Sequence, residues 1–191
     1  EATGSETDTA EEPGEGDGEA EEDEGEEDEA CDSAEGAEVS PGLSEHFQDW
    51  LADSAYKEHD FLRSDISTGS FGGMTGDSDC ATRHPVVFVH GNGDRALGGP
   101  YGGWEEPLAY FQAQGHRQAE LYATTYGPAD PSQTAFYHHS EEYVMHTRAF
   151  IEAVLEYTGA GKVDVIAHSM GVTMARKAIK GGAAEDPDEG G

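Results

Sequence analysis

The chain has 191 residues, and 41 acidic against 10 basic side chains give it a net charge of −31 at pH 7. So few Lys and Arg residues argue against nucleic acid as a partner, because phosphate binding needs clustered cations. No stretch approaches the roughly 18 consecutive apolar residues of a membrane span, so no transmembrane segment is expected.

The negative charge is concentrated at the beginning of the chain. Residues 1–38 hold 19 of the 41 acidic residues and no Lys or Arg. The stretch "GEGDGEAEEDEGEEDEACD" has almost no apolar side chains, so burial cannot offset the entropy of ordering it. We expect a disordered acidic tail or linker over residues 1–40 and a folded domain over 41–191. Loose association of Ca²⁺ with these carboxylates is the alternative, although no loop of the EF-hand kind is present.

Two features bear on localisation. Only two cysteines are present, Cys31 and Cys80, too few for a disulfide framework or a zinc site. In an exported protein they would be able to form a disulfide that tethers the tail to the domain. The chain begins with Glu1 and contains no signal-peptide pattern, so either a signal peptide has been removed or the sequence is an excerpt.

The first predicted element is a short helix that begins just after residue 43. Ser44 fits its N-cap and is followed by an acidic first turn. Apolar residues recur there at helical spacing: Leu43, Phe47, Trp50 and Leu51. The next stretch, 63–84, is rich in Gly, Ser and Asp and is expected to be a loop.

An alternation of strands and helices then begins. A short, largely apolar, β-branched run at 85–90 is typical of a strand buried on both faces. "AELYATTY" at 119–126 and "KVDVIAH" at 162–168 are expected to form the next two strands. Helices are expected around Trp104 to Phe111 and over 141–157, the second with Ser140 as N-cap and Gly159 as its end. This order predicts an α/β fold with a parallel sheet, flanking helices and right-handed crossovers.

The strongest motif is "AHSMG", residues 167–171, between the last predicted strand and a predicted helix. In a nucleophile elbow a serine occupies a strained strand-to-helix turn, which requires very small residues two positions before and two after. Here Ala167 takes the place of the more usual glycine, and Gly171 is present. We therefore predict that Ser169 is a nucleophile. A turn serine that only caps the helix is the alternative.

The loop "HGNGD", residues 90–94, follows the first long strand and is expected at the same edge of the sheet. In hydrolases of this kind such a loop supplies one backbone N–H of the oxyanion hole, and the residue after the nucleophile supplies the other. We assign these donors to Asn92 and Met170. Gly91 allows the sharp turn, and His90 is expected to support the loop.

Other polar residues near these motifs are less well placed. His168 is beside the serine in sequence, but its side chain is expected to point away, so we assign it a supporting role. His138 and His139 have no spaced third ligand and are expected to be loop residues, so we expect no metal site. Asp164 lies inside a strand and Asp94 in the oxyanion loop, so neither suits a catalytic acid.

The chain order of this fold is Ser, then Asp or Glu, then His. No histidine follows Ser169 in this sequence. We therefore expect the chain to be truncated, with the acid and the histidine encoded beyond Gly191, and this chain alone to be inactive.

Several blocks of the sequence resemble the class 2 lipase family of α/β-hydrolases. They are "FLRSDISTGSFGG", "PVVFVHGNGD", "AELYATTYGP" and "FIEAVLEYTGAGKVDVIAHSMGVTMARKAIKGG", and the likeness covers about residues 43–182. Small lidless bacterial lipases are similar around "VDVIAHSMG", and extracellular polyhydroxyalkanoate depolymerases around "HGNGD" and "AHSMGV". The resemblance implies secretion, no cofactor, and hydrolysis of carboxylic esters through an acyl-enzyme on Ser169. The acidic tail is not part of the family pattern.

We therefore expect a secreted, extracellular serine ester hydrolase, a lipase that acts on acylglycerols and contacts the lipid interface peripherally. Trp104, Tyr126 and Phe136 are candidates to receive the acyl chain, although each is equally compatible with the core. A polyhydroxyalkanoate depolymerase or a general carboxylesterase is the enzymatic alternative. The alternative from another class is a non-catalytic fragment or binding protein that keeps the elbow.

Overall fold

The computed structural model describes residues 38–182. The predicted acidic tail and Cys31 therefore lie almost wholly outside the described residues, and the boundary at residue 41 stays a prediction. No helix of the described part is long and apolar enough to cross a membrane.

A five-stranded sheet forms the centre of the domain, with the strand order β1-β2-β4-β3-β5. The strands are β1 (Gly42–Leu43), β2 (Ser70–Gly72), β3 (Val86–Val89), β4 (Leu121–Thr124) and β5 (Asp164–Ala167). Strand β3 pairs in parallel with both β4 and β5, so that Val87 lies opposite Tyr122 and Val165. These three strands are the predicted parallel sheet, and the α/β class is confirmed.

The sheet is wider than predicted, because two short strands extend it beyond β4. Strand β2 runs antiparallel to β4 and parallel to β1. The prediction of an uninterrupted loop over 63–84 is therefore wrong at Ser70–Gly72. Only three residues long, β2 shows no periodicity that a sequence pattern could reveal, and the fully buried Phe71 holds it in place. A Cβ on Gly72 would lie 2.6 Å from the Leu121 carbonyl oxygen, so glycine permits the close approach to β4.

Within residues 38–182, four α-helices flank the sheet, namely α1 (Glu45–Asp53), α2 (Glu105–Ala113), α3 (Glu141–Thr158) and α4 (Met170–Lys180). The predicted N-caps are confirmed, because Ser44 Oγ accepts from Phe47 N at 3.2 Å and Ser140 Oγ accepts from Tyr143 N at 3.3 Å. Gly159 ends α3 in the left-handed conformation, as expected.

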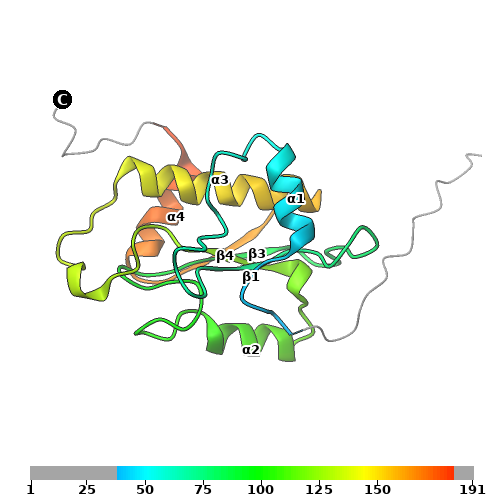
Figure 1. Ribbon diagram of the computed structural model, residues 1–191, viewed down its shortest axis with the longest axis horizontal. Coiled ribbons are helices and arrows are strands. Elements are labelled where there is room, and N and C mark those ends of the chain that lie inside the picture. Colours follow the sequence, from blue (N-terminus) through cyan, green and yellow to red (C-terminus); the bar gives the residue numbers. More distant parts are fainter. Residues whose placement is uncertain (1–37, 183–191) are drawn as a thin grey trace, which may run out of the picture.

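The helices form two layers, with α1, α3 and α4 on one face of the sheet and α2 on the other (Figure 1). Successive side chains of β3 point to opposite faces of the sheet and so pack in both layers. Val87 and Val89 belong to the larger core under α3 and α4, whereas Val86 and Phe88 belong to the smaller core against α2. The buried apolar side chains on both faces explain why this strand has no polar positions.

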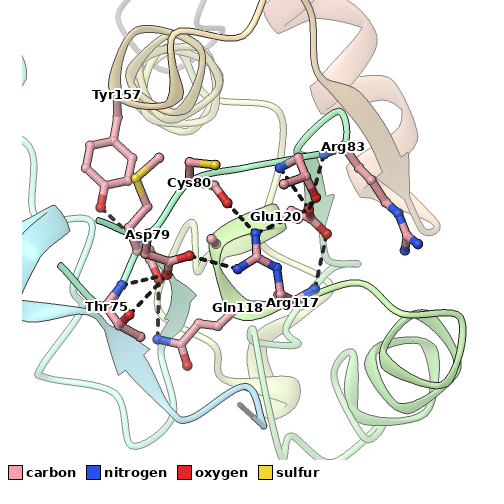
Figure 2. A network of polar contacts seen from close by, with 12 residues as sticks. Thr75, Asp79, Cys80, Arg83, Arg117, Gln118, Glu120 and Tyr157 are labelled. Carbon is pink, nitrogen blue, oxygen red and sulfur yellow. Dashed lines mark hydrogen bonds and ion pairs between the residues drawn. The ribbon is translucent and has the colours of Figure 1, made fainter. Parts of the chain in front are cut away.

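A buried polar network fixes the edge where β3 and β4 begin (Figure 2). The fully buried Glu120 accepts from Thr82 N at 3.0 Å and Arg83 N at 3.1 Å, so it holds the segment that leads into β3. Arg117 donates to Asp79 at 3.0 Å and to the Cys80 carbonyl at 2.5 Å. This network lies at the amino ends of the strands, whereas "HGNGD" and "AHSMG" follow their carboxyl ends.

Candidate active site

Ser169 lies in the sharp turn between the end of β5 at Ala167 and the start of α4 at Met170. Its φ of 52° and ψ of −126° are a conformation that non-glycine residues adopt only under strain. The residue is exposed, and its side chain makes no capping hydrogen bond to α4. A capping serine would make that bond, so the backbone strain is better explained by presentation of the hydroxyl.

The small residues of the two motifs allow them to touch. A Cβ on Gly171 would lie 2.3 Å from the His90 carbonyl oxygen, so α4 begins directly against the end of β3. A Cβ on Gly91 would lie 3.2 Å from Ser169 Cβ and 3.1 Å from His168 Nδ1. The structure thus brings the "HGNGD" loop and the elbow together, as the sequence predicts.

His90 is held rigidly inside this arrangement. Its Nε2 accepts from Tyr126 N at 3.1 Å, and its Nδ1 therefore carries the proton that is donated to the Gly91 carbonyl at 2.7 Å. The Tyr126 ring stacks on the imidazole with centroids 4.2 Å apart, and its hydroxyl donates to the His90 carbonyl at 2.9 Å. Burial lowers the pKa of His90 to about 4, so the ring is neutral at pH 7. Both ring nitrogens are engaged, which suits a supporting role.

Asn92 connects the loop to the segment over 127–140. Its Nδ2 donates to the Thr134 carbonyl at 2.8 Å, and a Cβ on Gly93 would lie 2.5 Å from Thr134 Cγ2. Asn92 and Met170, the two assigned oxyanion donors, line the same narrow pocket of about 10 Å³. That volume is close to the minimum that one water molecule, or one oxygen atom of a ligand, requires.

A second, larger pocket of about 730 Å³ adjoins the narrow one and shares Gly127, Pro128 and Tyr143 with it. Four carboxylates line it, on Glu58, Asp60, Asp65 and Glu142, together with Arg63, His59 and His146. Its volume falls within the range of ligand sites, roughly 300–1,000 Å³.

The three residues suggested for the acyl chain lie in different surroundings. Trp104 is 7% exposed and packs in the core beside Phe88, so it is a core residue and we do not propose it as a substrate contact. Tyr126 is 5% exposed and forms a wall of the narrow pocket. Phe136 is 77% exposed and lies two residues beyond Thr134, which contacts Asn92 and Gly93.

Among the remaining polar candidates, Asp94 belongs to the "HGNGD" loop, and His139 and Asp164 lie on other segments. His139 contacts Thr173 in the first turn of α4, and no group of three metal-ligating side chains exists within residues 38–182. Asp164 is exposed at the start of β5, far along the strand from the elbow. Asp94 is buried, and its Oδ1 accepts no hydrogen bond from the described residues.

Sequence reasoning missed residues whose hydrogen bonds hold the "HGNGD" loop or the segments next to it. These are Arg63, Thr125 and Thr134, each of which bonds across more than 25 positions. No local pattern marks such contacts, because they depend on which loops the fold brings together.

The sheet is largely parallel, and a serine lies at a strained turn after one strand. That turn packs against a glycine-containing loop after the neighbouring strand. This arrangement defines the α/β-hydrolase class of proteins, and this chain has that fold. A comparison with protein families gives a narrower class. Residues 83–190 match the family model of the class 2 lipases, more than half of the chain. The chain belongs to the class 2 lipase family, which makes it a hydrolase of the lipase type.

Proposed function

We propose that the protein is a secreted serine ester hydrolase, a lipase that cleaves acylglycerol esters through an acyl-enzyme on Ser169. The observation that supports this most is the contact between the two motifs. Gly91 abuts Ser169, and Asn92 and Met170 line one narrow pocket beside it.

In the proposed reaction Ser169 Oγ attacks the ester carbonyl while a histidine takes its proton. The carbonyl oxygen becomes an oxyanion that accepts from the backbone N–H groups of Asn92 and Met170. Collapse of the tetrahedral intermediate expels the alcohol, which receives the proton from the histidine. Water then releases the acid by the same steps. His90 does not serve as this histidine, because both of its ring nitrogens are engaged within the loop.

Phe136 is the residue we propose to contact the acyl chain or the lipid interface. It is exposed, lies on the segment that Asn92 holds through Thr134, and is next to Tyr137, which lines the narrow pocket. Tyr126 lines the pocket and is held there by stacking on His90.

The test uses protein expressed from its complete open reading frame. We expect release of fatty acid from emulsified triacylglycerol, and its loss in Ser169→Ala, because that variant keeps the fold and lacks the nucleophile. Clearing of a polyhydroxyalkanoate film without activity on triacylglycerol would contradict the lipase assignment in favour of a depolymerase. No difference between wild type and Ser169→Ala would contradict the serine mechanism itself.

A further inference from the structure

We infer that Arg63, oriented by Asp65, is a positioning residue for the oxyanion loop, acting through the segment 125–127 and His90. This inference rests on the proposed function, since it assigns to Arg63 the task of holding the Asn92 amide where the oxyanion forms.

Arg63 uses its guanidinium to hold the backbone just after β4. Its Nη1 donates to the carbonyl of Thr125 at 2.5 Å and to that of Gly127 at 2.9 Å. Its Nε and Nη2 form a bidentate pair with the Asp65 carboxylate at 2.8 and 2.9 Å. The Arg63 side chain is only 13% exposed, and its bonds to the two carbonyls are partly buried, whereas the Asp65 carboxylate is 59% exposed. Because the guanidinium is planar and its Nε and Nη2 are held by Asp65, the direction of Nη1 is fixed.

The segment that Arg63 holds carries Tyr126, the partner of His90. Tyr126 contacts His90 three times, through its backbone N–H, its hydroxyl and its ring. His90 in turn donates to the Gly91 carbonyl, and Gly91 lies against Ser169. A shift of 125–127 would therefore move His90 and Gly91, and with them the next residue, Asn92, the proposed oxyanion donor.

A second contact ties the same segment to Ala96, two residues beyond the loop over 90–94. Thr125 Oγ1 accepts from Ala96 N at 3.0 Å and donates to the Gly69 carbonyl at 2.7 Å. Segment 125–127 therefore contacts the chain on both sides of Asn92, at His90 and at Ala96. Arg63 binds two carbonyls of this segment at once, so one side chain anchors the segment at two points.

The effect on rate follows from the geometry of oxyanion stabilisation. Donors must meet the oxyanion at about 2.7–3.1 Å, and loss of one donor costs about 10²–10³ in kcat. A misplaced donor costs less than a missing one. We expect Arg63→Met to lower kcat by about 10- to 100-fold and to leave KM nearly unchanged, since the interaction strengthens only in the transition state.

Arg63 also lines the larger pocket, where direct binding of the substrate is the competing explanation. The two explanations differ in their kinetics. If Arg63 bound the substrate equally in the ground state and the transition state, its replacement would raise KM with little change in kcat. A positioning role instead predicts a lower kcat and a looser loop in the free protein, which substrate binding by Arg63 would not produce.

The experiment compares wild type with Arg63→Met, Arg63→Lys and Asp65→Asn. Arg83→Met is the matched control. Arg83 also donates to a backbone carbonyl, that of Gln114 at 2.9 Å, but it lies at the amino ends of the strands, away from the loop. Two readouts are taken on the protein from its complete open reading frame. They are kcat and KM on a soluble p-nitrophenyl ester, and amide hydrogen exchange of peptides covering 90–94 and 125–128.

We expect faster exchange in both peptides and a lower kcat in Arg63→Met, smaller changes of the same kind in Arg63→Lys and Asp65→Asn, and wild-type values in Arg83→Met. Exchange and kcat in Arg63→Met equal to those of Arg83→Met would overturn the inference, as would a change confined to KM. Should Arg63→Met fail to fold, Asp65→Asn decides, since Asp65 is 59% exposed and its replacement leaves the carbonyl contacts possible. If wild type hydrolyses no ester, the proposed function fails, and the exchange of 90–94 alone then decides whether Arg63 positions the loop.

Discussion

At the scale of single residues, the site depends on places where no side chain fits. Gly171 is the sharpest case, because an added Cβ would lie 2.3 Å from one backbone carbonyl oxygen and 2.4 Å from another. Backbone atoms of a buried strand cannot move aside as the end of a flexible side chain can. The elbow therefore requires glycine there, while Ala167, on the other side of Ser169, tolerates its methyl group.

Replacement of Gly171 by alanine tests this requirement. We expect a loss of about 1–3 kcal/mol in the free energy of unfolding and a strong loss of esterase activity, because α4 and the Met170 amide must shift. Urea unfolding and kcat measure the two effects. Gly161→Ala is the control, since nothing lies within 4 Å of a Cβ at Gly161. Equal stability of the two variants would contradict the close packing.

At the scale of elements, sequence reasoning succeeded where local chemistry decides the structure. The caps at Ser44 and Ser140, the left-handed Gly159 and the apolar run of β3 each follow from neighbouring residues alone. Strand β2 does not follow from its neighbouring residues, because it forms only by pairing with β4. The same distinction holds for the site. The elbow is a local motif, whereas the support from Tyr126, Arg63 and Thr134 comes from loops distant in sequence.

The network around Glu120 belongs to this scale too, since it joins the segment before β3 to the turn before β4. Glu120→Gln would leave buried donors with a weaker acceptor. It also removes the charge that faces Arg117 Nη2 at 4.0 Å. We expect the replacement to cost about 3–5 kcal/mol in unfolding free energy, the range for breaking a buried charge pair. Urea midpoints measure the loss, with the exposed Glu106→Gln as control. The network lies at the amino ends of the strands, away from Ser169. At a temperature where the variant is folded, kcat should therefore stay at the wild-type value. A fall in kcat would show that the two ends of the sheet are coupled.

At the scale of the whole molecule, buried histidines make stability depend on pH. Burial lowers the pKa of both His90 and His146 to about 4, below the usual value of 6.5. The unfolded chain therefore binds more protons than the folded one between these values, and this contribution to stability is lost as pH falls from about 6.5 to about 4. The many carboxylates act in the same range, so a variant must isolate the histidine effect.

His146→Gln provides that comparison, because His146 lies under the larger pocket and its Nε2 contacts Thr124 Oγ1 at 3.3 Å. We expect the free energy of unfolding to fall less steeply from pH 6.5 to about pH 4.5 in the variant than in wild type. His84→Gln, at an exposed position, should keep the wild-type dependence. Parallel curves for wild type and His146→Gln would contradict the assignment.

The central claim, that Ser169 is an activated nucleophile, is tested most directly by covalent labelling. Protein expressed from its complete open reading frame is treated with a fluorophosphonate, digested and analysed by mass spectrometry for the modified residue. We predict one phosphonylated site, Ser169, and no labelling in Ser169→Ala. A folded protein that takes no label, or takes it at another residue, would show that the strained turn between β5 and α4 does not present a catalytic serine.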